Sequence, residues 1–268
     1  MEFLLRFESP IRLVCFIVVL LLMMIWEWRR PRRSIDLPRR RRWPANLGIV
    51  VVDSLTLRFF VPVLAVGAAL EAEARGWGFL YGLNTPYPLA FVLSLLLLDL
   101  AIYGQHVVFH KVPLLWRVHR MHHSDTGIDV TTGLRFHPLE IVLSMLIKVV
   151  AVIILGAPAA AVLAFEVILN AIAMFNHGNI ALPACADRWL RYFIVTPDMH
   201  RVHHSVYRDE TDSNYGFNLS WWDYLFRTYR AQPRDGHQAM VIGLPSFRDR
   251  RSVGLHWLLA QPFLRASR

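Results

Sequence analysis

The residues of this chain best suited to chemistry are its histidines. The sequence has 268 residues and 12 histidines, and ten of these fall between positions 106 and 204. Most of the ten form three clusters with helical spacing: His106-x-x-x-His110, His119-x-x-His122-His123 and His200-x-x-His203-His204. Residues three and four positions apart share a face of a helix. Because neutral imidazole nitrogens suit Fe, Zn, Cu and Ni, the repeated pattern predicts one shared metal site.

Two single histidines lie beside the clusters. His137 precedes an apolar run in the segment Arg-Phe-His-Pro, and His177 follows another in Phe-Asn-His-Gly-Asn. Both lie at predicted helix ends on the side of the clusters, so both are candidate ligands, although a single histidine is more often structural. Ten histidines would be enough to ligate two metal ions. His237 and His256 lie in a later region without pattern, and we expect neither to bind metal.

Polar residues continue back from the first cluster along the same predicted helix. Asp99 and Tyr103 extend the stripe of His106 and His110 in steps of four, three and four. A metal-bound imidazole normally donates its other N–H to a carboxylate or carbonyl, so Asp99 is a candidate partner for His106, directly or through a water or tyrosine relay. The alternative is a polar stripe that is satisfied inside the core.

Other carboxylates near the clusters are offset from their histidine faces, so we expect them to support the ligands rather than bind metal. These are Asp125, Asp129, Glu140 and Asp198. The chain has no Glu-x-x-His motif, which soluble di-iron bundles use. It also lacks the His-Glu-x-x-His of metalloproteases, in which the Glu is the general base. A metallohydrolase is therefore a weak alternative.

The elements that must position these residues are apolar. Hydrophobic residues make up 55% of the chain and the mean hydropathy is +0.36, which predicts an all-helical integral membrane protein. Five apolar runs are candidate membrane helices: Ile11–Trp26, Leu47–Leu70, Leu89–Phe109, Ile141–Leu155 and Ala159–Phe175. The last two are short against the roughly 20 residues of a full span. Gly156-Ala157-Pro158 joins them, so they predict a tight hairpin whose complete crossing stays open.

Basic residues predict the orientation of the chain. Eight arginines lie between Arg29 and Arg42, a block that Pro31 and Pro38 interrupt. No cleavage site follows the first apolar run, so we expect a retained anchor, with the arginine block on the cytoplasmic side. Counting crossings from there places every histidine cluster in a cytoplasmic cap, with residues 1–88 as anchor, 89–230 as catalytic domain and 231–268 as tail.

The overall charge limits the kinds of binding partner, and the cysteine count limits the kinds of covalent or metal cross-link. A net charge of +9 fits contact with an anionic membrane surface. Nucleic-acid binding is the other common role of a basic chain. Such binding needs no long apolar spans, so we do not expect this chain to bind nucleic acid. Cys15 and Cys185 are the two cysteines, which gives neither a disulfide framework nor a cysteine-based zinc motif.

Two further predictions concern single side chains in or near the membrane. Lys148 and Glu166 lie nine residues before and after Ala157. In an antiparallel hairpin they therefore fall at equal depth, and we expect them to pair because an isolated charge there is costly. Trp116, Trp221 and Trp222 lie near the clusters as interfacial anchors or, alternatively, as walls of a substrate slot.

With these residues in view, the chain resembles a known family. The three clusters look like the histidine boxes of the fatty acid hydroxylase / sterol desaturase superfamily. Segments around them, over about residues 90–230, resemble its sterol-desaturase-like bacterial members: Thr132-Gly-Leu-Arg-Phe-His-Pro-Leu-Glu140, Phe175-Asn-His-Gly-Asn179, Thr196-Pro-Asp-Met-His200, Asn214-Tyr-Gly-Phe217 and Trp222-Asp223.

The resemblance implies an enzyme with a non-haem di-iron centre on the cytoplasmic face of a membrane domain, in a bacterium the inner membrane. It implies O2, two external electrons, and hydroxylation or desaturation of a sterol, fatty acyl, carotenoid or alkyl-ether lipid. Since no fused haem or flavin motif is present, we expect a separate reductase as partner. The alternative is a non-catalytic zinc-binding scaffold or metal transporter, and zinc would also substitute for iron in preparations. The oligomeric state is not predicted.

Overall fold

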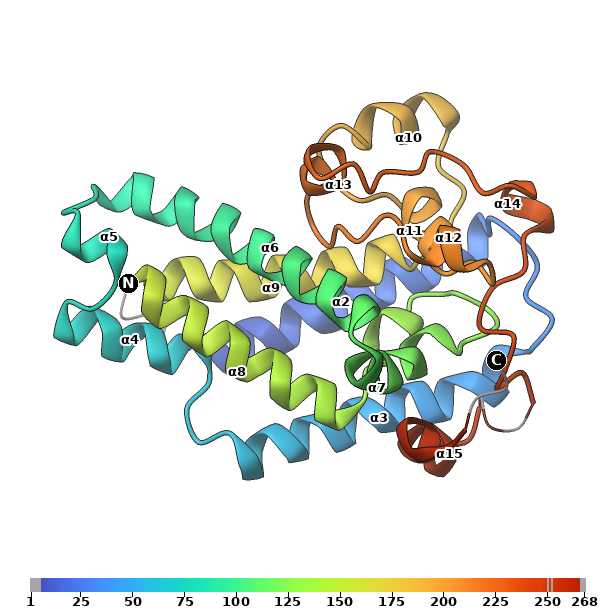
Figure 1. The fold of residues 1–268 in the computed structure, drawn as a ribbon, viewed down its shortest axis with the longest axis horizontal. Coiled ribbons are helices and arrows are strands. Elements are labelled where there is room, and N and C mark those ends of the chain that lie inside the picture. The colour runs from blue at the N-terminus through green and yellow to red at the C-terminus, as the bar shows by residue number, and fades with distance from the viewer. Residues whose placement is uncertain (1–5, 250, 252, 266–268) are drawn as a thin grey trace.

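The fold is a bundle of membrane-type helices with a cap at one end. The computed structural model describes residues 6–249, 251 and 253–265, and these contain helices and isolated bridges but no strand. The long helices run side by side along the long axis of Figure 1. The bundle consists of α2 (Glu8–Arg29), α3 (Arg39–Phe60), α4 (Ala65–Arg75), α5 (Phe79–Gly82), α6 (Tyr87–Lys111), α8 (Pro138–Leu155) and α9 (Ala159–Asn176).

Five stretches of the described residues are long and apolar enough to cross a membrane. They correspond to the five predicted runs, which confirms the all-helical membrane fold. Each helix of the α8–α9 hairpin has 18 residues, a length of about 27 Å. Gly156 closes α8 in the left-handed conformation (φ 67°), which favours glycine.

The second predicted run differs from the expectation because it is interrupted. The segment from Val61 to Leu64 is not helical, and α4 continues after it. Pro62 has no backbone N–H and disfavours the helical conformation in the residue before it. Val61 is accordingly extended, with φ −123° and ψ 93°. The candidate membrane span of this region therefore includes both α3 and α4. The helix α4 packs against both α8 and α9.

The predicted pairing of Lys148 with Glu166 is confirmed. Lys148 Nζ lies 2.6 Å from Glu166 Oε1. The sequence did not predict the third member, Arg12 of α2, which binds the other oxygen of Glu166. Glu166 thus bridges two cations from separate helices, one of which also lies 2.9 Å from Glu8.

The cap gathers at the end of the bundle where α6 and α9 end and where α3 and α8 begin (Figure 1). The segment Arg30–Pro38, between α2 and α3, lies at this same end. The cap contains α7 (Pro113–His123), η1 (Thr132–Leu134), α10 (Ala184–Leu190), α11 (Pro197–His203), α12 (Arg208–Thr211), α13 (Trp221–Leu225), α14 (Gly236–Ala239), α15 (Leu255–Ala260) and η3 (Gln261–Phe263).

One part of the cap reaches back along the bundle. Trp222 of α13 donates its indole N–H to Asp99 of α6 (2.9 Å), and the ring of Phe226 stacks on Tyr103 at 5.4 Å. Asp99 lies roughly 18 Å before the end of α6, by the rise of a helix. The helix α13 therefore lies beside the spanning part of α6. Trp221 is exposed there, as an anchor would be, whereas Trp222 is tied to Asp99 and Trp116 is half-buried against His110.

Candidate metal centre

Nine histidines converge in the cap as two groups of buried side chains. The first group contains His106, His110, His119, His123 and His203, and the second contains His122, His177, His200 and His204. Within each group the nitrogens lie within 4.8 Å of one another. These are the nine histidines of the three clusters and the Phe-Asn-His-Gly-Asn segment.

Each HxxHH cluster is divided between the two groups. His119 and His123 of α7 enter the first group, whereas His122 enters the second. On α11 the assignment is reversed, because His200 and His204 enter the second group and His203 enters the first. Successive residues are about 100° apart on a helix, so the imidazole at i+3 leans away from the one at i+4. The two short helices thus lie between the groups and join them into one centre.

Hydrogen bonds on the outer side fix the orientation of five rings. Nδ1 of His106 lies 2.7 Å from the Tyr215 carbonyl, and Nδ1 of His203 lies 2.7 Å from the Ser213 carbonyl. The other three Nδ1 contacts are His122 to the Arg135 carbonyl, His177 to the Ala173 carbonyl and His119 to Glu140 Oε1. A carbonyl only accepts, so Nδ1 carries the proton wherever it faces one, and Nε2 offers a lone pair.

The inward nitrogens then face one another. Nε2 of His203 lies 3.1 Å from Nε2 of His106, and Nε2 of His177 lies 3.0 Å from that of His122. Two lone pairs at this distance repel, and a cation between them removes the conflict. Both ring nitrogens of His110 and of His204 are buried without a hydrogen-bond partner, which is rare for buried polar groups. The donor set therefore fits metal ions.

Burial keeps the imidazoles neutral. It lowers the pKa of His177 to about 4 and that of His203 to about 3. Burial, together with the neighbouring imidazoles, also holds the pKa values of the remaining cap histidines of the second group, His122, His200 and His204, well below the ordinary value. A neutral imidazole is the form that binds metal, so these side chains need no deprotonation at neutral pH.

The supporting carboxylates are partly those expected from the sequence. Glu140, in the first turn of α8, accepts from His119 at 2.7 Å. Asp212, which sequence reasoning missed, has an oxygen 3.4 Å from Nδ1 of His110, without hydrogen-bond geometry. It lies in the loop after α12, eight residues beyond the third cluster, and no spacing rule links it to His110.

Asp99 and Tyr103 make their hydrogen bonds to the 215–228 segment, as the alternative of a polar stripe satisfied inside the core describes. Asp99 does not contact His106, because it accepts from the backbone N–H groups of Asn218 and Leu219 and from Trp222. Tyr103 pairs instead with Thr228 at 2.9 Å. Asp99 and His106 are about two helical turns apart, which is too far for direct contact.

His137 and Asp198 also lie outside the two groups. His137 is the N-cap of α8: its Nδ1 accepts from the Leu139 N–H and its Nε2 faces the Leu259 carbonyl. The following proline at N1 makes this position suitable for a cap. Asp198 binds Arg32 and Arg201. His237 lies 3.7 Å from Asp198, apart from both groups.

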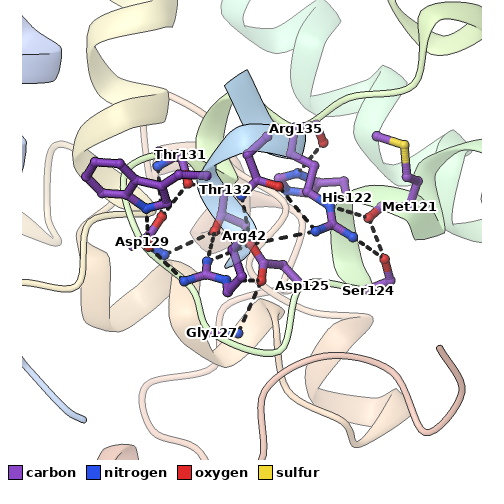
Figure 2. Close-up of polar contacts among 12 residues, drawn as sticks. Arg42, Met121, His122, Ser124, Asp125, Gly127, Asp129, Thr131, Thr132 and Arg135 are labelled. Atoms are coloured by element: carbon purple, nitrogen blue, oxygen red, sulfur yellow. Dashed lines mark hydrogen bonds and ion pairs between the residues drawn. The ribbon is translucent and has the colours of Figure 1, made fainter. Parts of the chain in front are cut away.

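A buried ionic network lies next to the histidine cluster of α7 and contacts it through Arg135 (Figure 2). Arg42, from the arginine block, binds Asp125 with two hydrogen bonds of 2.7 Å and Asp129 with one of 2.8 Å. Arg135 donates to the Met121 carbonyl at 3.0 Å, while its own carbonyl faces His122. Burial opposes the charge of Asp125, but Arg42 and Arg135 outweigh it, so the pKa of Asp125 is below its ordinary value.

A cavity of about 580 Å³ lies next to the first group. His106, His119 and Phe217 line it at the cap, and Arg12, Lys148 and Glu166 line it inside the bundle. Its remaining wall is mostly apolar, with Leu57, Ile102, Phe136 and Met145 among the residues. The cavity thus connects the imidazoles with the interior of the membrane domain.

The chain is similar in sequence to several known proteins. The chain is 32% identical over 224 residues to an ornithine lipid hydroxylase of Rhizobium tropici, which covers 82% of this chain and 63% of that protein. It is 27% identical to the alkylglycerol monooxygenase of Homo sapiens (62% of this chain, 35% of that protein). It is 26% identical to a Delta(7)-sterol-C5(6)-desaturase of Nicotiana tabacum (54% and 51%).

The chain thus spans less than two thirds of the length of these relatives. No solved structure matches it. The model of the fatty acid hydroxylase family matches residues 91–228, just over half of the chain. This match runs from α6 through both HxxHH clusters to the segment after α13, and it includes all nine converging histidines. The chain therefore belongs to the fatty acid hydroxylase family.

Proposed function

We propose that this protein is a membrane-bound oxidoreductase that uses O2 and two histidine-bound iron ions to hydroxylate or desaturate a lipid. The observation that carries this proposal is the pair of buried imidazole groups, joined by α7 and α11, beside a cavity that extends into the membrane domain. The names of the relatives, a lipid hydroxylase, an alkylglycerol monooxygenase and a sterol desaturase, support a lipid substrate.

The ligand set in this proposal is the nine histidines, with no carboxylate among them. Bound iron would supply the oxidising power that cleavage of an alkyl C–H bond requires and that no side chain has. The chain's own residues hold the imidazoles in place through Nδ1, with Tyr215, Ser213, Ala173 and Arg135 accepting through carbonyls. The apolar cavity wall would receive the lipid and exclude water.

The proposed reaction needs electrons from another protein and a defined side of the membrane. We place the cap on the cytoplasmic side, because the arginine-rich segment lies at the same end of the bundle and basic segments stay in the cytoplasm. A cytoplasmic reductase would then reach the cap, while the lipid reaches the cavity from the bilayer. A zinc transporter would carry its metal-binding groups near the membrane midplane, whereas α7 and α11, which carry the two HxxHH clusters, lie at one end of the bundle (Figure 1).

The test is metal content together with product formation. The chain expressed with added iron is expected to bind two iron ions, and to consume O2 and modify a membrane lipid only when a reductase system is supplied. His203→Ala should lower the iron content and abolish the product. The exposed His256 provides the matched control, because His256→Ala should change neither. Full activity with zinc, or without an electron source, would contradict the proposal.

A further inference from the structure

One side of the cap carries a group of exposed aromatic and apolar side chains. They come from the end of α10 and from α13, and we call them the aromatic face: Tyr192, Phe193, Trp221, Tyr224, Leu225 and Phe226. By contrast, the exposed side chains of α12 are Arg208 and Asp209, and those of α14 are Gln238 and Ala239. The aromatic face is therefore a local feature of the cap that needs an apolar partner.

The two parts of the aromatic face are joined to each other. Trp221 donates its indole N–H to the carbonyl of Tyr192 at 2.8 Å. The rings of Tyr192 and Tyr224 stack, with their centroids 6.5 Å apart. Beside them the backbone N–H of Val195 donates to the carbonyl of Asn218 at 2.9 Å. Because these contacts connect the end of α10 with α13, the aromatic face is one fixed surface.

The membrane depth of the aromatic face follows from the length of α6. The 25 residues of α6 extend over about 37 Å, against about 30 Å for the hydrocarbon core of a bilayer. Even an upright α6 that projected only at the cap would thus leave about 7 Å outside the core, and tilt would leave less. Tyr103 lies eight residues before Lys111, the end of α6, a distance of about 12 Å by the rise of a helix. Tyr103 is therefore at the depth of the hydrocarbon core.

Phe226 connects this depth to the aromatic face. Its ring stacks on Tyr103 at 5.4 Å, yet the residue is 52% exposed. Trp222, the neighbour of Trp221, binds Asp99, which lies still further from the cap end of α6. In Figure 1, α13 is accordingly nearer than α11, α12 and α14 to the middle of the bundle. The exposed side of Phe226 thus lies at the depth of lipid acyl chains.

The chemistry of the aromatic face suits the boundary between lipid headgroups and acyl chains. Tryptophan and tyrosine are enriched there, because their rings are apolar and their N–H or O–H groups reach polar atoms. The exposed charged side chains of residues 184–194 and 219–229 are both arginines, Arg188 and Arg227. Arginines at this boundary reach the phosphates of anionic lipids. The charge and the apolar surface therefore fit the same partner.

We propose that the aromatic face is a membrane-contact surface, embedded at the headgroup boundary of the bilayer. The cap is then held to the membrane by α10 and α13 as well as by the spanning helices. The segment before α13 supplies the Tyr215 carbonyl, which accepts from His106, and Phe217, which lines the cavity. Lipid contact thus begins a few residues from the metal centre. This inference depends on the membrane fold and not on the proposed reaction.

The test attaches a bimane fluorophore to single cysteines of the full-length protein in phospholipid vesicles. Cys15→Ser and Cys185→Ser provide the background without native thiols. Leu225→Cys and Phe193→Cys report on the aromatic face from its two parts, so that the test survives if one of them does not fold. Val92→Cys, on the exposed side of α6, is the lipid-facing control, and Ala239→Cys, exposed on α14, is the water-facing control.

Lipids that carry a nitroxide on the acyl chain are expected to quench most of the fluorescence at Leu225→Cys and Phe193→Cys, as at Val92→Cys. Iodide in the water should quench these labels little and should quench Ala239→Cys strongly. Quenching of the aromatic face by iodide and not by nitroxide lipid would overturn the proposal, since the face would then lie in water. Protection from both quenchers would equally overturn it, because a second copy of the chain or another protein would then cover the face. No readout involves metal, O2 or product, so the oxygenase proposal stands or fails separately.

Discussion

At the scale of single residues, the metal centre depends on the oxygens that accept a hydrogen bond from Nδ1 of five of its histidines. Four of the five oriented rings face backbone carbonyls, which substitution cannot remove directly. His119 is the exception, because its Nδ1 faces a side chain, the carboxylate of Glu140. Such outer partners fix the tautomer and raise the basicity of the ligand.

We therefore expect Glu140→Ala to weaken iron binding about 10- to 100-fold, the usual effect of losing such a partner. Glu140→Gln keeps an acceptor oxygen, so its iron affinity should lie between those of Glu140→Ala and the wild type. Equilibrium competition with a coloured chelator measures the affinity. Glu71→Ala, at an exposed acid of α4, serves as the control. Iron affinity that stays the same in Glu140→Ala would show that Glu140 does not support the ligand.

At the scale of elements, two ionic clusters join helices that are far apart in the sequence. Arg42 joins α3 to the loop between α7 and η1 (Figure 2). Glu166 joins α8, α9 and α2 inside the membrane domain. In both clusters one side chain has two oppositely charged partners, so its loss leaves two like charges behind.

Arg42→Ala is expected to destabilise the protein by about 3–5 kcal/mol, because buried Asp129 loses its ion pair with Arg42 and buried Asp125 keeps only Arg135, at 3.9 Å. The loss should also lower iron binding, since Arg42 and Arg135 share Asp125 and the Arg135 carbonyl faces His122. Melting temperature and iron content are the measurements. The neighbouring Arg40 is exposed, and Arg40→Ala should leave both unchanged.

For the membrane cluster we expect an order of effects. Glu166→Gln should lower the melting temperature more than Lys148→Met, because the first leaves two cations facing each other and the second leaves Arg12 paired with Glu166. The double swap Lys148→Glu with Glu166→Lys should recover only part of the loss, since Arg12 then faces the introduced lysine. Full recovery by the double swap would mean that Arg12 contributes nothing.

At the scale of the whole molecule, the cap with the histidine clusters lies at one end of an apolar bundle. The helix ends that reach the cap, the arginine-rich segment, and the helices α7 and α11 with the two HxxHH clusters share this end (Figure 1). The turn between α5 and α6 lies at the opposite end. One labelling experiment can therefore assign both ends to their compartments.

We expect a membrane-impermeant maleimide to label Leu83→Cys in intact cells, and Arg40→Cys or the exposed native Cys185 only after the cells are permeabilised. Leu83 is 73% exposed beyond α5 and Arg40 is also exposed, so each site is open to the reagent. Cys15→Ser is made in every variant, and Cys185→Ser is added to Leu83→Cys and to Arg40→Cys, so that each protein carries a single thiol. Labelling of Arg40→Cys and Cys185 in different compartments would contradict the shared end, and labelling of both in intact cells would reverse the orientation.

The sequence by itself determined the local features, because local spacing encodes them. The i, i+3 and i+4 repeats identified the imidazole faces, the apolar runs identified the five spans, and equal distance from Ala157 identified the contact of Lys148 with Glu166. The break at Pro62 was not predicted, because the hydropathy of its run concealed it.

Only the tertiary structure decided which groups meet across long stretches of sequence. It divided each HxxHH cluster between two groups, brought Arg12 to Glu166, and buried Arg42 among acids more than 80 residues away. It also supplied the partners of Asp99, the backbone N–H groups of Asn218 and Leu219 in the loop before α13. Such contacts depend on how helices pack and which loop covers them, and the periodicity of a single segment contains no information about either.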